Sequence, residues 1–301
     1  MNKEFEGVYP ALITPMDSDG NLNESALRKV IEFNISAGVH GFWVAGGSGE
    51  SVLLDDEENC RIAQIVTEET KGRVKNIMHV GTLTTARSAN LAEHAAKSGV
   101  DAICCVPPFF YRQNDEAIVE HYRVIASAAD LPFFVYNLPS LTQVEITSDL
   151  MQKIQEKVPQ LVGLKHSAPD IEAIRQFRDM GLCCMMGNSR LMLQSLMMGA
   201  SGCIDGPQGI MPELFLDIWN SFQSGNFQQA RDSQEKTAKV ASLVPITKQQ
   251  AFYKAFISKR IGVNCGQPRP PLEGLTTSEK KVLLEIIDKL EIKPNTEFKE
   301  N

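Results

Sequence analysis

The amino-acid sequence predicts an α/β protein with a (β/α)8 barrel, the TIM-barrel fold, followed by a C-terminal helical extension. Short apolar segments alternate with longer amphipathic segments along most of the chain, a pattern typical of repeated strand–helix units. No G-x-G-x-x-G fingerprint follows the first apolar segment, which disfavours a doubly wound dinucleotide-binding sheet. The 301 residues also exceed the about 250 that such a barrel needs.

The expected strands are short apolar runs bounded by glycine or proline residues. Asn23 or Ser25 is expected to cap the first helix and Gly38 to end it, and Gly99 is expected to end the third helix. The expected strands are residues 8–14, 40–45, 76–81, 101–106, 132–136, 161–165, 182–186 and 202–204, and the helices between them are residues 23–36, 55–70, 85–97, 115–128, a helix from 147, 169–179 and 187–198.

Beyond residue 215 the sequence predicts only helices, at residues 215–222, 226–242, 247–261 and 277–290. The first of them completes the eighth strand–helix unit, and the others exceed what the barrel needs. We therefore divide the chain into a barrel, residues 1–224, and a helical extension packed on it, residues 225–301. No linker or low-complexity segment separates the two parts.

The composition is that of a moderately acidic globular chain, with a net charge of −7, 43% hydrophobic residues and 22% charged residues. Because Lys and Arg are not clustered, nucleic acid and anionic membranes are not expected as partners. The seven cysteines form no CxxC pair, and Cys104-Cys105 and Cys183-Cys184 lie in apolar runs, where cysteine packs as a small hydrophobic residue. Without a signal-peptide pattern or an apolar run of ~18 residues, we expect a cytoplasmic protein with no membrane span, metal or cofactor.

Lys165 is the residue on which the candidate chemistry depends. It closes the apolar run that begins at Leu161, and catalytic groups of TIM barrels lie at the C-terminal ends of the strands. Burial among apolar groups favours the neutral form of an amine, and a neutral amine can attack a ketone to form an imine. The alternative is a lysine that packs its stem on the barrel rim and extends its charge into water.

Tyr136 ends the fifth expected strand, beside the strand of Lys165. A phenol next to an amine can pass protons during imine chemistry, although a tyrosine there can also be a core residue whose hydroxyl bonds the backbone. In the glycine-rich loop 46–51, backbone N–H groups and the Ser48 hydroxyl can hold a carboxylate or phosphate before the next helix. Since no Lys-Ser/Thr pair follows, the loop is not a P-loop, and a carboxylate is the expected anion.

Further candidates follow the sixth and seventh expected strands. The guanidinium of Arg190 can bind a second anionic group of a substrate, or it can face solvent or pair between subunits. His166 is expected to be a structural hydrogen-bonding residue, with a role as a general base as the alternative. Phe109, Phe110 and Tyr111, which follow the fourth expected strand, are expected at the barrel mouth or in a subunit contact. The remaining strand-end candidates for substrate binding are Ser167, Gly187 and Ser189.

Five sequence motifs resemble those of the N-acetylneuraminate lyase and dihydrodipicolinate synthase superfamily. The motifs are Gly7-Val-Tyr-Pro-Ala-Leu-Ile-Thr-Pro15, Gly46-Gly-Ser-Gly-Glu-Ser51, Tyr136-Asn-Leu-Pro-Ser-Leu-Thr142, Gly163-Leu-Lys165 and Gly199-Ala-Ser-Gly-Cys-Ile204. They occur in register over essentially the whole chain. The resemblance is therefore specific for the superfamily, but it is not specific for one substrate.

The resemblance implies a class I aldolase mechanism, in which Lys165 forms a Schiff base with the keto carbon of a pyruvate unit. Tyr136 would move protons, and Ser48 with the amide of Gly47 would hold the carboxylate. Ile204 would contribute backbone atoms near the same keto acid. The resemblance also implies a homotetramer built as a dimer of dimers, with pyruvate and an aldehyde as small-molecule partners.

The sequence departs from both branches of the superfamily near the expected site. Synthases of the lysine pathway carry hydroxyl-bearing residues where this chain has Gly47 and Phe110, and an arginine where it has Leu141. Sialic acid lyases carry an acidic pair where this chain has Ser189-Arg190, and a Ser-Thr pair where it has Gly206-Pro207. The first difference disfavours the lysine-pathway reaction. The second favours a substrate with a distal carboxylate or with fewer hydroxyl groups than sialic acid.

We predict an aldolase nearer the lyase branch, which cleaves or forms a 2-keto-3-deoxy sugar acid or a related 4-hydroxy-2-oxo acid. One alternative is a sugar-acid dehydratase or a dihydrodipicolinate synthase that uses the same imine. Another is a non-catalytic protein that binds keto acids, which the lack of a hydroxyl group at Gly47 favours.

Overall fold

The computed structural model describes residues 3–242, 244 and 246–289. Eight parallel strands form a nearly closed barrel, so the predicted (β/α)8 fold is confirmed. The strands are β1 (Gly7–Pro10), β2 (Gly41–Val44), β3 (Lys75–His79), β4 (Ala102–Cys105), β5 (Phe133–Asn137), β6 (Leu161–His166), β7 (Cys183–Met186) and β8 (Gly202–Asp205).

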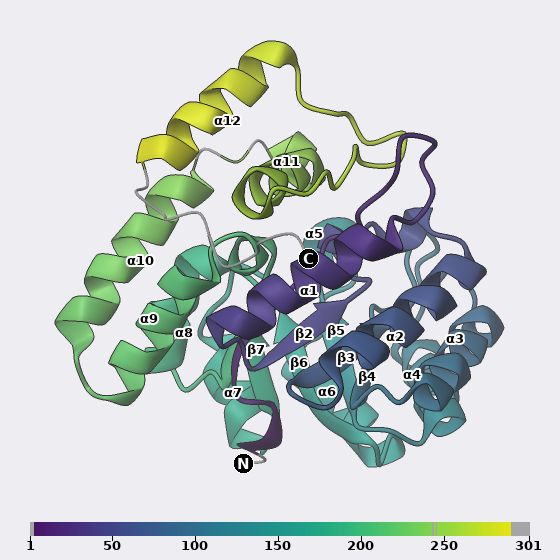
Figure 1. Ribbon diagram of the computed structural model, residues 1–301. Helices are drawn as coiled ribbons and strands as arrows, with labels where there is room; N and C mark the ends of the chain where they lie inside the picture. The colour runs from purple at the N-terminus through teal and green to yellow at the C-terminus, as the bar shows by residue number, and fades with distance from the viewer. Residues whose placement is uncertain (1–2, 243, 245, 290–301) are drawn as a thin grey trace.

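Helices surround the strands (Figure 1), with α2 to α4 at the right of the view, α8 to α10 at the left and α1 across the centre. α11 and α12 lie at the top of the view, beyond α1. The helices are α1 (Glu24–Ala37), α2 (Asp56–Thr70), α3 (Thr85–Ser98), α4 (Asp115–Ala129), α5 (Pro139–Thr142), α6 (Ser148–Lys157), α7 (Ala173–Asp179), α8 (Met192–Met197), α9 (Pro212–Gln223), α10 (Phe227–Ala241), α11 (Gln249–Ile261) and α12 (Thr277–Lys289).

The helix ends follow the capping signals of the sequence. Asn23, not Ser25, is the N-cap of α1, and its side chain accepts a hydrogen bond from the backbone N–H of Ala26. Gly38 and Gly99 end α1 and α3 with φ angles of 98° and 86°, in the left-handed region that glycine adopts without steric cost. These local signals account for the accuracy of the predicted ends of α1 and α3.

The barrel is closed between β1 and β2, the two strands at the ends of the sheet order. The strands follow the order β1-β8-β7-β6-β5-β4-β3-β2, and a single parallel bridge joins Ala11 to Trp43. The backbone N–H of Leu12 donates to the carbonyl of Trp43 at 3.0 Å. On β6, a side chain at Gly163 would lie 2.2 Å from the carbonyl oxygen of Cys183, so only glycine allows β6 and β7 to pair here.

The interior of the barrel is a separate apolar cluster from the larger layer between strands and helices. It contains Trp43, Cys104, Phe134, Tyr136 and Met185, all of which are buried. Because the strands alternate inward and outward side chains, a polar group on an inward position of this cluster is held among aromatic and sulfur-containing neighbours. Lys165 is such a group, because its ammonium lies over the rings of Trp43 and Tyr136.

The predicted elements differ from the observed ones at a few places. The helix expected at residues 169–179 is α7, which begins only at Ala173, because residues 169–172 form bends and a turn. The short helix α5 was not predicted, and residue 290, the expected end of the last helix, lies outside the described residues. The expected boundary at residue 224 falls between α9 and α10, and the division into two units stays a prediction. Every helix that the structure describes is too short or too polar to cross a lipid bilayer.

Candidate active site

Lys165 and Tyr136 are direct partners across neighbouring strands. Tyr136 on β5 pairs in register with Lys165 on β6, so both side chains leave the sheet at the same level and on the same face. The Lys165 Nζ lies 4.5 Å from the ring centroid of Tyr136 and 5.1 Å from that of Trp43. Both rings attract the Lys165 ammonium through cation–π contacts and shield it from water. The sequence-predicted pair is therefore brought together by strand register.

Two titratable groups that interact with Lys165, His79 and Cys104, are uncharged near pH 7. Burial, together with the positive charge of Lys165, lowers the pKa of His79 to about 4, so its imidazole is neutral near pH 7. The His79 ring lies edge-on to Tyr136, with 6.1 Å between centroids. Burial also raises the pKa of the Cys104 thiol well above its usual value. Among the residues that the structure describes, no carboxylate forms an ion pair with Lys165, which leaves the amine available to a ligand.

His166 holds the end of β6 in place. Its Nδ1 lies 3.2 Å from Asn137 Nδ2, and its Nε2 lies 2.6 Å from the carbonyl oxygen of Asp170. Asn137 Oδ1 in turn accepts a hydrogen bond from the backbone N–H of Ile146. Burial lowers the pKa of His166. A neutral imidazole with both nitrogens engaged is a structural group, as the sequence predicted.

The loop 46–51 folds into two short 3-10 turns, η2 (Gly47–Gly49) and η3 (Ser51–Leu53). α2 begins only at Asp56, so the backbone N–H groups of this loop belong to 3-10 turns and not to the start of α2. The Thr14 hydroxyl donates to the carbonyl of Gly49 at 2.7 Å. A Cβ atom at Gly46 would lie 2.7 Å from the Trp43 indole, so the loop rests on the ring that also contacts Lys165.

Asp205, at the end of β8, organises the loops after β7 and β8. Its carboxylate accepts hydrogen bonds from the backbone N–H groups of Ser189 and Gly206, each at 2.8 Å. Ser189 is itself buried, with its carbonyl bound by the Gln234 side chain at 3.1 Å. The Asp205 carboxylate therefore fixes these two loops relative to each other, a role that the sequence did not reveal.

Ser167 and Gly187 lie against each other. A Cβ atom at Gly187 would come within 1.8 Å of the Ser167 hydroxyl, which thus occupies the space that a side chain would need. Within the described part of the chain, the Ser167 Oγ has no hydrogen-bond partner although it is buried. A buried hydroxyl without a partner is a site at which a ligand atom can bind favourably. Ile204, on β8, is fully buried in the barrel interior cluster.

Tyr253, on α11, is a residue that sequence reasoning missed. A Cβ atom at Gly206 would lie 2.4 Å from its ring and 2.8 Å from the Ser48 hydroxyl, so Gly206 lies between the two groups. Burial raises the pKa of Tyr253 well above its usual value. The guanidinium of Arg190, which is exposed, donates to the carbonyl of Ala241 at the end of α10. Because α11 lies outside the strand–helix repeat, the strand-end rule could not find Tyr253.

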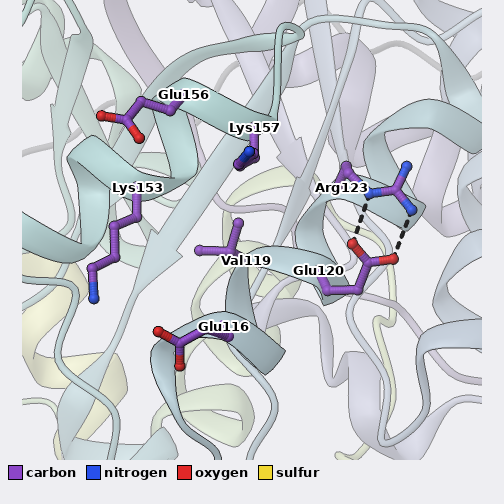
Figure 2. A pocket seen from close by; sticks show the side chains of 7 residues that line it. All are labelled: Glu116, Val119, Glu120, Arg123, Lys153, Glu156 and Lys157. Atoms are coloured by element: carbon purple, nitrogen blue, oxygen red, sulfur yellow. Dashed lines mark hydrogen bonds and ion pairs between the residues drawn. The ribbon is translucent and has the colours of Figure 1, made fainter.

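A surface pocket of about 280 Å³ lies elsewhere, between α4 and α6 (Figure 2). Charged side chains line it, and Figure 2 shows Arg123 paired with Glu120 at its edge. None of its lining residues ends a barrel strand, so we do not assign chemistry to it. The described residues also contain no group of three His, Cys, Asp or Glu side chains that could hold a metal ion.

Comparisons with known proteins agree on one family. The sequence model of the dihydrodipicolinate synthetase family matches residues 4–290. An N-acetylneuraminate lyase from Citrobacter koseri is 33% identical over 292 residues, covering 94% of this chain and 97% of that protein. A 4-hydroxy-tetrahydrodipicolinate synthase from Methanopyrus kandleri is 30% identical over 298 residues, covering 98% of this chain and 99% of that protein. A catalytic lysine mutant of the Ruminococcus gnavus sialic acid aldolase has a similar solved structure, with a TM-score of 0.93, 26% identity, and coverage of 96% and 97%.

The barrel and its strand-end groups, together with these relatives, define an enzyme of the pyruvate-dependent class I aldolases, whose members are lyases or aldolases. The chain belongs to the dihydrodipicolinate synthetase family. The predicted superfamily is thereby confirmed. Relatives with two different names, a lyase and a synthase, match the chain at similar identity.

Proposed function

We propose that the protein is an aldolase in which Lys165 forms an imine with the C2 keto carbon of a 2-oxo acid. The observation that carries this proposal is the buried Lys165 amine, held 4.5 Å from the ring centroid of Tyr136. The amine nitrogen attacks C2, the keto oxygen leaves as water, and a protonated imine results. The imine then accepts the electron pair of a neighbouring bond as that bond breaks.

For a 4-hydroxy-2-oxo acid, the breaking bond joins C3 and C4. The C4 hydroxyl loses its proton, an aldehyde leaves, and the bond's electron pair forms an enamine with the imine. Protonation at C3 and hydrolysis by water release pyruvate and restore the amine of Lys165. We assign these proton transfers to the Tyr136 hydroxyl, because Tyr136 is the strand partner of Lys165.

The substrate that we propose is a 2-keto-3-deoxy sugar acid or a related 4-hydroxy-2-oxo acid. Its carboxylate would bind the amide of Gly47 and the Ser48 hydroxyl, close to the backbone of Ile204. Its tail would extend past the loops after β6 and β7. The exposed guanidinium of Arg190 suits a distal anionic group there. The other residues that we assign to the tail are Ser167, Gly187 and Ser189.

The imine is tested by reduction with borohydride in the presence of pyruvate. We expect a mass increase on the peptide that carries Lys165, and no labelling in the Lys165→Ala variant. Lys254 is a useful internal control, because it is equally buried but forms an ion pair with Glu50. The absence of an adduct, or labelling that survives Lys165→Ala, contradicts the proposal.

A second candidate is a synthase or dehydratase that uses the same imine. The relative from Methanopyrus kandleri, named a synthase, supports it at 30% identity. A screen of 4-hydroxy-2-oxo acids and sugar acids distinguishes the candidates, because only the lyase releases pyruvate, which lactate dehydrogenase detects. A non-catalytic keto-acid-binding protein would instead show a raised melting temperature with pyruvate and no turnover.

We also propose that copies of the chain assemble, as a homotetramer, through the exposed rim of the barrel. Phe110, Tyr111 and Leu141 are 84%, 73% and 73% exposed, which is unusual for large apolar side chains. The Phe110 and Tyr111 rings contact each other edge-to-face at 5.0 Å. They line one surface cavity with Leu141, so a second copy can cover all three together.

A cytoplasmic location and a mechanism without a metal or cofactor complete the proposal. All seven cysteines are free, and six of them are buried, which suits a reducing compartment. An imine on Lys165 supplies the electron sink that a cofactor would otherwise provide.

A further inference from the structure

Glu50 and Lys254 form a fully buried ion pair between the glycine-rich loop and the C-terminal extension. The Lys254 Nζ lies 2.6 Å from Glu50 Oε1, and both side chains have 0% exposure. Glu50 directly follows η2, which contains Gly47 and Ser48, and Lys254 lies on α11. Two residues that are 204 positions apart in the sequence are thus joined beside the proposed carboxylate site.

Additional hydrogen bonds hold both members of the pair. The second Glu50 oxygen accepts the backbone N–H of Arg269 at 2.7 Å, and Lys254 Nζ donates to the carbonyl of Gln267 at 3.0 Å. One turn before Lys254 on α11, the Gln250 side chain donates to the carbonyl of Gly47 at 3.1 Å. The loop is therefore held at Gly47 and at Glu50 by the same C-terminal segment.

Arg269 anchors the far end of this loop. Its guanidinium binds both oxygens of Glu58, at 2.5 and 2.7 Å, and also donates to the carbonyl of Leu53 at 3.1 Å. The backbone of Glu50 has a φ angle of 63°, in the left-handed region that a residue with a side chain adopts at a cost. A strained conformation that several contacts maintain is typical of a functional loop.

Stability alone does not explain a charged pair at this position. Removing two charges from water is costly, and a well-packed apolar pair would hold α11 on the barrel at least as firmly. Unlike an apolar pair, an ion pair fixes the direction of the contact, and Lys254 neutralises the charge of Glu50. Without Lys254, the Glu50 carboxylate would place a negative charge close to any anion that binds at Gly47 and Ser48.

We infer that the Glu50–Lys254 ion pair positions the loop of Gly47 and Ser48 for a carboxylate, so that the C-terminal extension completes the substrate site. Glu50 and Lys254 are positioning residues, because they act through Gly47 and Ser48 and do not touch the reacting atoms. The inference rests on the proposed function, since it takes a 2-oxo acid carboxylate as the anion. It adds to that function a dependence of substrate affinity on a helix outside the barrel.

The positioning role of the ion pair is tested with Lys254→Met and with the double variant Glu50→Gln/Lys254→Met. The double variant removes both charges of the pair, so that neither is left buried without a partner. The matched control is Arg260→Met, because Arg260 lies on α11 like Lys254. This change removes the ion pair between Arg260 and Glu213 of α9, whose charged atoms are 3.0 Å apart. One measurement is the exchange of the C3 hydrogens of pyruvate for deuterium, followed by proton NMR as a function of pyruvate concentration. The other is amide hydrogen exchange of residues 46–54, followed by mass spectrometry.

We expect both Lys254 variants to raise the half-saturating pyruvate concentration by about tenfold or more and to change the maximal exchange rate by less than about threefold. Amide exchange of residues 46–54 should become faster in both. The Arg260→Met control should lower the melting temperature and leave both other measurements unchanged. A merely structural role for the pair would lower the melting temperature as in this control, without the rise in half-saturating pyruvate.

The inference is overturned if the double variant folds and matches the wild type, or the control, in both measurements. If wild-type protein does not exchange the hydrogens of pyruvate at any concentration, the proposed function fails separately. In that case the amide exchange measurement by itself tests whether the ion pair positions the loop. Wild-type exchange rates at residues 46–54 in the double variant would reject it, and faster rates confined to this loop would support it.

Discussion

Gly206 offers a sharp test of the proposed carboxylate site. In the Gly206→Ala variant, the new methyl group would lie 2.4 Å from a ring carbon of Tyr253 and 2.8 Å from the Ser48 hydroxyl oxygen. Ordinary contacts of this kind measure 3.4–4 Å. The buried Tyr253 ring or the Ser48 side chain must therefore move, and Ser48 is the more mobile of the two because it is only partly buried.

The expected effect has two parts. Overpacking of a well-packed site costs about 1–3 kcal/mol of unfolding free energy. Displacing the Ser48 hydroxyl removes a hydrogen bond to a charged group, which is worth about 1.5–3 kcal/mol, or roughly 10- to 100-fold in the half-saturating pyruvate concentration. The maximal rate of C3 hydrogen exchange should change far less, because Lys165 and Tyr136 are not displaced.

Gly209→Ala is the matched control, because it makes the same change on the same turn, η5 (Gly206–Gly209). Its methyl group would meet only the Pro10 side chain, at 3.6 Å, an ordinary contact. Urea unfolding and the pyruvate exchange assay are measured on both variants and on the wild type. If Gly206→Ala binds pyruvate as tightly as Gly209→Ala does, Ser48 does not hold the carboxylate.

Three further predictions follow from the site and the surface. Tyr136→Phe should slow pyruvate hydrogen exchange about 10²- to 10⁴-fold with little change in melting temperature, because the ring keeps its contacts with Trp43 and Lys165; an NMR rate within threefold of wild type would exclude Tyr136 as the proton-transfer group. In the unfolded chain His79 binds a proton once the pH falls below its ordinary pKa of 6.5, whereas in the folded chain it does so only near pH 4. The contribution of His79 to the free energy of unfolding is therefore fully present above pH 6.5 and should be about 2 kcal/mol smaller at pH 5. Urea titrations of wild type and His79→Gln check this, and equal slopes with pH would contradict it. Tyr111→Glu and Leu141→Glu should shift the sedimentation coefficient to that of a smaller species, whereas Val282→Glu, on the outer helix α12, should not; unchanged sedimentation of the first two would place the subunit contact elsewhere.

The sequence predicted the barrel because its signals are local. Each strand is a short apolar run, and several helices begin or end at a recognisable capping residue, such as Asn23 or Gly99. The candidate pair Lys165 and Tyr136 could be predicted for the same reason. Both residues end strands that are consecutive in the chain, and consecutive strands of this fold are neighbours.

Other parts of the site could not be predicted, because they depend on contacts between distant segments. Asp205 was a strand-end position like several others, and only the folded loops show that its carboxylate holds Ser189 and Gly206. The position of Tyr253 beside Gly206 depends on how α11 packs across the barrel mouth. No periodicity or motif in the sequence encodes that packing.

The sequence by itself determined the fold class, the superfamily and the lysine on which the proposed chemistry depends. Repeat patterns and strand ends depend only on residues that are close together in the chain. Only the tertiary structure decided that Glu50 is paired with Lys254 and that α11 reaches the glycine-rich loop 46–51. The physical reason is that a buried charge needs an oppositely charged group beside it. That group can come from any segment that the fold places there, however distant in the sequence.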